Sequence, residues 1–125
     1  MNNKKVFQKL VRDRIPELIE RNGAVPDVEI LDDLRFAAML DEKLLEECGE
    51  LLAAKDVDSK IEEMADILEV LHAMAEVWGL TMAEVEAIRL RKRAERGAFQ
   101  KKLLLISASS KREKGGQNAD NANRH

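Results

Sequence analysis

Apolar side chains recur three and four positions apart along most of the chain, which is the spacing of one face of a helix. This spacing predicts three long helices, over residues 34–55, 59–78 and 81–96, and a short helix over residues 15–21. The turn between the first two long segments is short and polar, so these helices are expected to be antiparallel neighbours. The expected fold is therefore an all-α helical bundle, with two long antiparallel helices and flanking helices.

Residues with capping side chains mark the predicted starts of the helices. An N-cap side chain accepts a hydrogen bond from a backbone N–H of the first turn. The candidates, in chain order, are Asp13, then Asp32 or Asp33, then Asp58 or Ser59. Thr81 and Glu84 match the capping box and predict the start of the last helix.

The C-terminal part of the chain changes character twice. Residues 99–106 are apolar and are expected to form a short strand or an extended arm packing on the bundle. From residue 107 the chain is polar, which is typical of a disordered tail. We therefore expect a helical domain over residues 1–106 and a tail over residues 107–125.

Composition narrows the classes of function. The 125 residues are 45% apolar and carry a net charge of −3, which argues against stable nucleic-acid binding. Acidic residues concentrate in segment 42–69 and basic ones in segment 89–102, a separation that suits a polyanionic ligand. Cys48 is the single cysteine, and no apolar run reaches the length of a membrane span. These features predict a cytoplasmic protein that does not enter a membrane. Cys48 and Trp78 fall on the apolar faces of their predicted helices and are expected in the core.

Four acidic residues fall where the helical pattern calls for apolar ones. On a helical wheel with about 100° per residue, Glu47 lies inside the apolar stripe of the first long helix and Glu50 lies on its margin. Glu63 and Asp66 take the same relative positions on the second long helix. Since the two helices are expected to face each other, all four carboxylates are expected to meet.

Carboxylates on apolar faces need a positively charged partner. Burying an unpaired carboxylate on an apolar face costs roughly several kcal/mol of folding free energy. Lys43, at the margin, is the one nearby cation on these stripes. Mg²⁺ prefers carboxylate oxygens, and the i, i+3 spacing lets two side chains of one helix reach one ion. The pattern predicts a Mg²⁺ site, with Mn²⁺ as a substitute ion, at Glu47, Glu50, Glu63 and Asp66. Cationic groups from another subunit are the structural alternative, and for Glu46 a solvated surface position is the simpler interpretation.

Three separated motifs resemble a known family. The sequence E-E-C-G-E at 46–50, followed after twelve residues by E-M-A-D at 63–66, is similar to the EExxE…ExxD signature of the MazG-like all-α NTP pyrophosphohydrolases. The segments K-L-V-R-D-R-I-P-E-L-I at 9–19 and K-R-A-E-R-G-A-F at 92–99 resemble its small house-cleaning branch. The matches cover residues 9 to about 106.

The resemblance implies an enzyme of defined chemistry. It implies a helical bundle, usually dimeric or larger, that holds Mg²⁺ on the four carboxylates and hydrolyses a nucleoside triphosphate to a monophosphate and pyrophosphate. Within such a mechanism Glu46 or Glu47 is the candidate general base. The basic residues expected to hold the β and γ phosphates are Lys9, Arg12, Arg14, Lys92, Arg93 and Arg96.

Two rival functions remain open at this point. Phosphoribosyl-ATP pyrophosphohydrolases share the carboxylate motif, although the R-D-R-I-P opening favours the house-cleaning branch. A non-catalytic helical bundle that senses nucleotides is the alternative from another class. The motifs leave the base and sugar of the substrate undefined.

Overall fold

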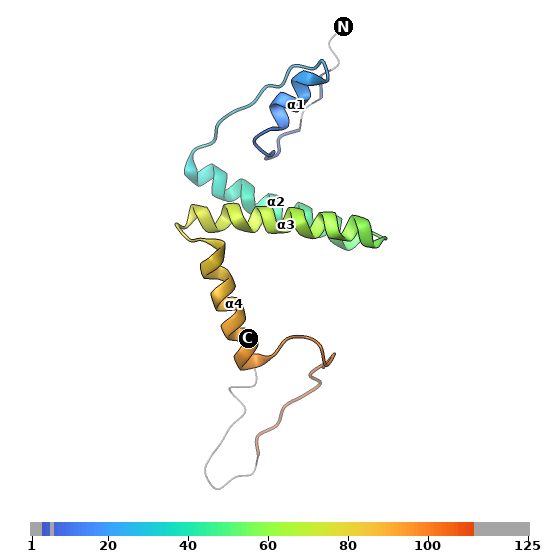
Figure 1. Ribbon diagram of the computed structural model, residues 1–125, viewed down its shortest axis with the longest axis vertical. Coiled ribbons are helices and arrows are strands. Elements are labelled where there is room, and N and C mark those ends of the chain that lie inside the picture. Colours follow the sequence, from blue (N-terminus) through green and yellow to red (C-terminus); the bar gives the residue numbers. More distant parts are fainter. Residues whose placement is uncertain (1–3, 6, 112–125) are drawn as a thin grey trace. The chain divides into compact units, whose positions relative to one another are not determined.

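The computed structural model describes residues 4, 5 and 7–111 (Figure 1). Four helices follow one another along the chain: α1 (Ile15–Arg21), α2 (Asp33–Ala53), α3 (Val57–Val77) and α4 (Met82–Arg96). The prediction of an all-α fold with four helices is confirmed. Residues 99–106 contain no strand, and their large apolar side chains are exposed, with Phe99 at 98% and Leu103 at 84%, so packing of this segment on the bundle stays a prediction.

The chain divides into two compact units, Met1–Arg89 and Leu90–His125, and each is described by itself. The first unit holds α1, α2, α3 and the start of α4, and it contains all the predicted carboxylate ligands. The expected boundary between a domain and a tail, after residue 106, falls within the second unit and stays a prediction. Residues 112–125 of the expected tail lie outside the described residues.

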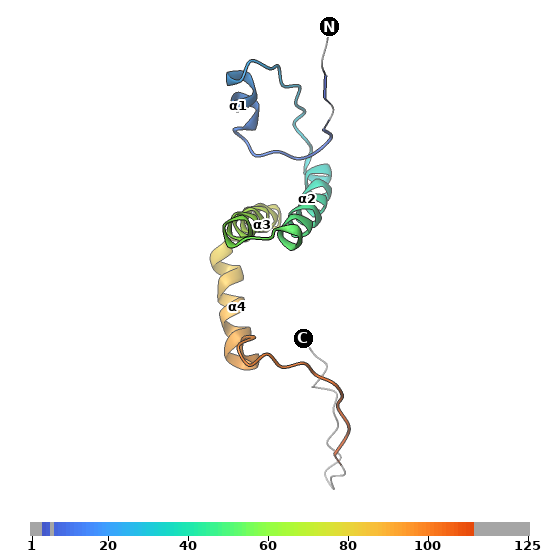
Figure 2. The ribbon, with the colours of Figure 1, turned by 90° about the vertical axis from the view of Figure 1, so that its right-hand side faces the viewer.

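Helices α2 and α3 pack side by side and antiparallel in the first unit (Figures 1 and 2). The three residues between them, 54–56, leave room for a tight reversal only. The core of the described residues is thin: Leu40 is 3% exposed, Val70 7% and Ala75 5%. Glu47 is as buried as these apolar side chains, at 5% exposure. The pair of helices therefore buries a carboxyl group together with a small apolar core.

Side-chain caps begin three of the helices. Asp32 caps α2 by accepting the Arg35 N–H at 2.8 Å, which decides between the two predicted residues. Thr81 and Glu84 form the predicted capping box before α4: Glu84 Oε2 accepts the Thr81 N–H at 2.9 Å, and Thr81 Oγ1 accepts the Glu84 N–H at 3.2 Å. Each cap satisfies a backbone donor that the first helical turn leaves unpaired.

Two of the predicted caps were wrong. Helix α1 has Arg14 at its N-cap with no capping side chain, so Asp13 does not cap it. Helix α3 begins two residues earlier than predicted, because Asp56 has an extended backbone and accepts the Ser59 N–H at 2.8 Å. Ser59 is thus the donor in the cap that it was expected to make.

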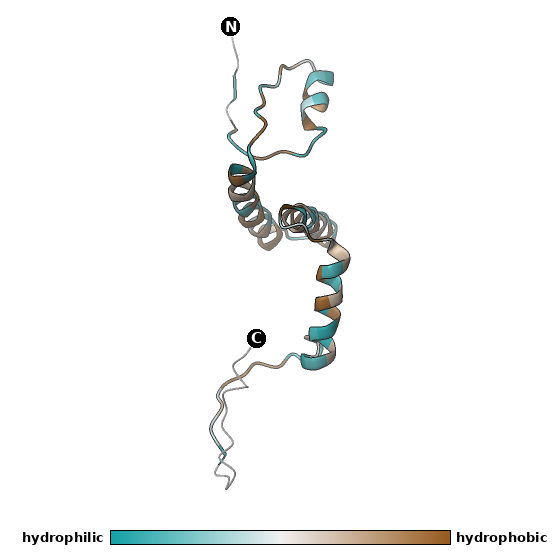
Figure 3. Cartoon of the chain, turned by 90° about the vertical axis from the view of Figure 1, so that its left-hand side faces the viewer, coloured by the Kyte–Doolittle hydropathy of each residue, from teal (hydrophilic) through white to brown (hydrophobic). Residues whose placement is uncertain are grey.

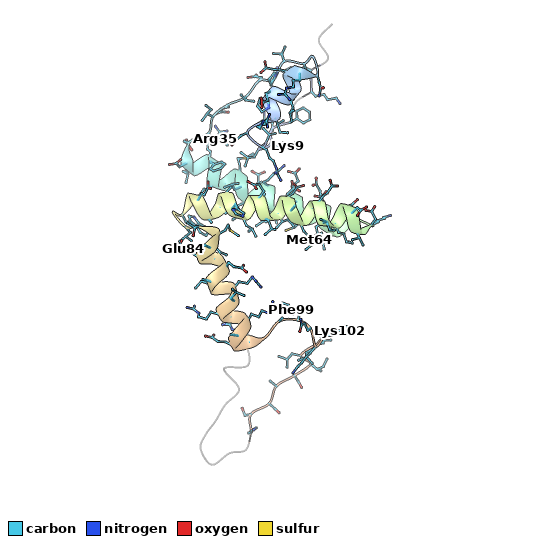
Figure 4. All side chains as sticks on the ribbon, viewed as in Figure 1. Lys9, Arg35, Met64, Glu84, Phe99 and Lys102 are labelled. Atoms are coloured by element: carbon cyan, nitrogen blue, oxygen red, sulfur yellow. The ribbon has the colours of Figure 1, made fainter. Side chains whose placement is uncertain are left out.

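Several large apolar side chains of α3 are exposed in the described structure. Ile61, Met64 and Leu68 are 59%, 55% and 53% exposed, and their spacing puts them on one face of α3. Figure 3 shows how hydropathy varies along the helices, and Figure 4 labels Met64. The prediction that Trp78 packs in the core was wrong: this residue is the C-cap of α3 and is 71% exposed.

No helix in the described part of the chain combines the length and the apolar character that a membrane span requires.

Candidate metal centre

Three of the predicted carboxylates come together between α2 and α3. Glu47, Glu50 and Glu63 each offer one oxygen, and these three oxygens lie within 4.8 Å of one another. Glu47 and Glu50 are three residues apart in α2 and so project from one face of that helix. Glu63 reaches them from α3 because the two helices pack against each other. The name "acidic cluster" is used below for these three glutamates.

Two oxygens of the acidic cluster are buried without a hydrogen-bond partner. They are Oε2 of Glu47 and Oε2 of Glu63. A buried carboxylate oxygen that lacks a partner carries a desolvation cost that the fold does not recover elsewhere. Glu50 is exposed, so the cluster opens to solvent on that side. This arrangement fits a cation that enters from solvent.

The electrostatics of the cluster point to the same need for positive charge. Burial raises the pKa of Glu47 above its ordinary value of 4.5, and the neighbouring Glu50 raises it further, while Lys43 acts in the opposite direction. Burial is also the largest cause that raises the pKa of Glu63. The charges of Glu47 and Asp66 add to this rise, and the hydrogen-bonding interaction with Glu50 opposes it. The protein alone therefore disfavours full ionisation of the cluster.

Asp66, the fourth predicted ligand, lies outside the acidic cluster and has a partner of its own. Its Oδ1 accepts a hydrogen bond from Arg12 Nη2 at 2.6 Å. Arg12 belongs to the segment before α1, so this ion pair attaches that segment to α3. The side chains are 57% and 40% exposed, which leaves the pair open to exchange with solvent. A predicted metal ligand and a predicted phosphate-binding residue thus bind each other in this structure.

Lys43 is a member of the site that sequence analysis placed only at its margin. Its Nζ lies 3.4 Å from Glu47 Oε1 and 3.6 Å from Glu46 Oε2. On the other side of Glu46, Lys9 Nζ lies 4.0 Å from Oε1. Glu46 is thus held between two ammonium groups at the edge of the acidic cluster. The i, i+4 spacing of Lys43 and Glu47 was the signal that could have identified this contact.

A pocket of about 210 Å³ lies beside the acidic cluster, between the segment before α1 and α2. Its lining residues are Gln8, Lys9, Leu10, Met39, Glu42, Lys43 and Glu46. Lys43 lines this pocket and also contacts Glu47 of the cluster. Pocket and cluster are therefore adjacent parts of one site.

Among the remaining predicted phosphate-binding residues, Arg14 is the one that lies in the first unit. Arg14 donates from Nε to Glu17 Oε1 at 2.6 Å, so it is engaged within α1. The three basic residues of α4 are exposed and belong to the second unit, and their role stays a prediction; they are Lys92, Arg93 and Arg96.

The acidic cluster fits a hard divalent cation. Its donors are carboxylate oxygens, which suit Mg²⁺ and Mn²⁺ better than the softer metals. The partnerless oxygens of Glu47 and Glu63 are acceptors that such an ion would satisfy. Glu47, Glu50 and Glu63 would hold the ion, whereas Asp66 lies outside the cluster and its Oδ1 is bonded to Arg12.

Comparisons with known proteins do not assign a family to this chain. No model of a protein family matches it. An uncharacterized protein of Mycolicibacterium smegmatis is 50% identical over 54 residues, which cover 43% of this chain and 55% of that protein. The chain thus spans about half the length of this curated relative. No solved structure matches.

Proposed function

We propose that this protein is a Mg²⁺-dependent pyrophosphohydrolase that cleaves nucleoside triphosphates, including non-canonical ones, to a nucleoside monophosphate and pyrophosphate. The observation that carries the proposal is the acidic cluster, whose three carboxylate oxygens lie within 4.8 Å of one another. The buried, partnerless oxygens of Glu47 and Glu63 support it. The sequence motifs add the resemblance to the MazG-like bundle, of which the α2–α3 pair would be the central part.

The metal would supply Lewis-acid chemistry, polarising the phosphate and making an attacking water more acidic. Glu47, Glu50 and Glu63 would bind it, and Mn²⁺ would replace Mg²⁺. Of the two candidate general bases, Glu46 lies at the edge of the cluster and outside the set of three ligands. Its carboxylate oxygens lie 4.0 Å from Lys9 Nζ and 3.6 Å from Lys43 Nζ, and Glu46 would be the group that accepts the proton of the water.

The proposed enzyme acts as a homodimer or a larger homo-oligomer in the cytoplasm, where its nucleotide substrates are found. The thin core and the exposed face formed by Ile61, Met64 and Leu68 support the assembly. A second copy would cover this face, which otherwise leaves large apolar side chains in water.

Pyrophosphate release tests the proposal. A panel of canonical, deoxy and damaged nucleoside triphosphates is incubated with the protein in Mg²⁺ or in EDTA. We expect release in Mg²⁺ alone, and a loss of about a hundredfold or more in Glu50→Gln. Glu62→Gln is the matched control, because Glu62 is an exposed residue of α3 outside the cluster, and it should keep its activity.

A folded protein that binds Mg²⁺ but releases no pyrophosphate from any nucleoside triphosphate would overturn the proposal. Hydrolysis of phosphoribosyl-ATP by that protein would then identify the rival enzyme. Nucleotide binding without turnover of either substrate would instead indicate a sensor.

A further inference from the structure

We infer that the pocket beside the acidic cluster binds the nucleobase of the substrate and selects bases that carry an exocyclic amino group. This inference rests on the proposed function, because it places the phosphates of the same substrate on the acidic cluster. The pocket is lined from two directions, by residues 8–10 of the segment before α1 and by α2.

The position of the pocket relative to the acidic cluster sets which end of a nucleotide it can take. Lys43 lines the pocket and lies 3.4 Å from Glu47 of the cluster, so the two regions share this side chain. A ligand with its phosphates at the cluster would therefore place its next chemical group in the pocket. In a nucleoside triphosphate that group is the nucleoside.

The volume and charge of the pocket favour a base over further phosphates. At about 210 Å³ it is smaller than the roughly 300–1,000 Å³ of sites that enclose drug-sized ligands, so it suits one ring system. Its two lysines are balanced by Glu42 and Glu46, and a site without excess positive charge is a poor match for a polyphosphate.

Its walls offer the contacts that a base requires. Leu10 and Met39 supply apolar surface, and the thioether of methionine makes favourable contacts with aromatic rings. The Gln8 amide offers both a donor and an acceptor for the polar edge of a base. Gln8 has a φ of 54°, the left-handed region that is uncommon for residues other than glycine. The backbone bends at the next residue, Lys9.

Glu42 gives the pocket its selectivity. The other lining carboxylate, Glu46, is held by Lys9 and Lys43, whereas the ion pairs among the described residues leave Glu42 free. An ionised carboxylate accepts hydrogen bonds and cannot donate them. It can therefore bind the amino group of cytosine, but it opposes the carbonyl oxygen that uracil has at the same ring position.

Equilibrium binding of CMP and UMP to the full chain, measured by calorimetry, tests the inference without requiring turnover. We expect CMP to bind more tightly than UMP in the wild type, by about tenfold. Glu42→Gln should remove this preference, because an amide can donate to a carbonyl as well as accept. Asp41→Asn is the matched control: Asp41 is the exposed neighbour of Glu42 and does not line the pocket, so its preference should be unchanged.

A second variant tests the place of binding. Met39→Ala should weaken CMP and UMP equally, by about fivefold or more, and leave the binding of inorganic pyrophosphate in Mg²⁺ unchanged. Equal affinities of wild type for CMP and UMP, or a CMP affinity that neither Glu42→Gln nor Met39→Ala changes, would overturn the inference. A protein that binds CMP as expected but hydrolyses no nucleoside triphosphate would instead overturn the proposed function and leave the base pocket standing.

Discussion

Arg12 and Asp66 are 54 residues apart in the sequence, and the Arg12 guanidinium donates a 2.6 Å hydrogen bond to Asp66 Oδ1. The pair joins the segment before α1 to α3, next to the acidic cluster. It matters for function because Asp66 is the fourth carboxylate of the motif that the sequence identified. An ion bound through Asp66 would compete with Arg12 for the same carboxylate.

Removal of Arg12 is therefore expected to favour the metal. In Arg12→Gln, Asp66 loses its ion pair and becomes available, so the protein should bind Mn²⁺ several-fold more tightly, as measured by electron paramagnetic resonance of free Mn²⁺. Arg14→Gln is the control. Arg14 pairs with Glu17 in α1, and among the described residues it forms no ion pair with the acidic cluster. An unchanged Mn²⁺ affinity in Arg12→Gln would remove Asp66 from the set of ligands.

The raised pKa values of Glu47 and Glu63 predict how stability depends on pH in EDTA. An acid whose pKa is raised by folding favours the folded state fully below its unfolded pKa, and this contribution is lost as pH rises through the folded pKa. Both groups are raised above 4.5, so their effect is an increase in Tm as pH falls from neutral toward 4.5. Glu47→Gln should raise Tm at neutral pH and flatten this part of the profile.

The two acids whose pKa values are lowered by folding, Asp56 and Glu86, act below this window. The pKa of Asp56 is lowered below 3.8 by its hydrogen bonds to Ser59, so the stability it contributes is lost only as pH falls further. In saturating Mg²⁺, Tm should instead fall as pH falls from neutral to 4.5, because protons then compete with the ion for the carboxylates. The measurement is thermal unfolding by circular dichroism across this range, with and without Mg²⁺. A profile in EDTA that falls with acidification through this window would contradict the raised pKa values.

Periodicity in the sequence was enough to predict the four helices, because apolar residues three and four positions apart mark one face of a helix. Helices α2 and α3 bury residues on such faces, whereas α4 has no buried residue. The same wheel placed Glu47 inside the apolar stripe, and its side chain is 5% exposed. The helix caps were harder to predict. Asp56, rather than Asp58 or Ser59, caps α3, because backbone conformation decides between such close candidates. The Arg12–Asp66 contact could not be predicted, since it depends on how the segment before α1 folds back onto α3.

The thin core predicts that a few residues carry much of the stability of the first unit. Leu40 is 3% exposed, and Leu40→Ala should lower the free energy of unfolding by about 2–4 kcal/mol through the lost burial and the cavity left behind. Leu52→Ala removes the same atoms from a position of the same helix that is 83% exposed, so it should cost less than about 0.5 kcal/mol. Urea unfolding of the two variants measures both values. Equal costs would show that Leu52 is covered in solution.

The exposed face of α3 predicts the assembly state. Ile61, Met64 and Leu68 are all more than half exposed, and a second copy that covers them would bury apolar surface worth roughly 25 cal/mol per Å². A charge placed on this face would be buried in the interface, so Leu68→Glu should shift the protein toward monomer in sedimentation velocity. Val25→Glu makes the same change at a connector residue that is 92% exposed and should leave the sedimentation coefficient as in the wild type. A wild-type protein that sediments as a monomer at every concentration would show that this face is not covered by a second copy.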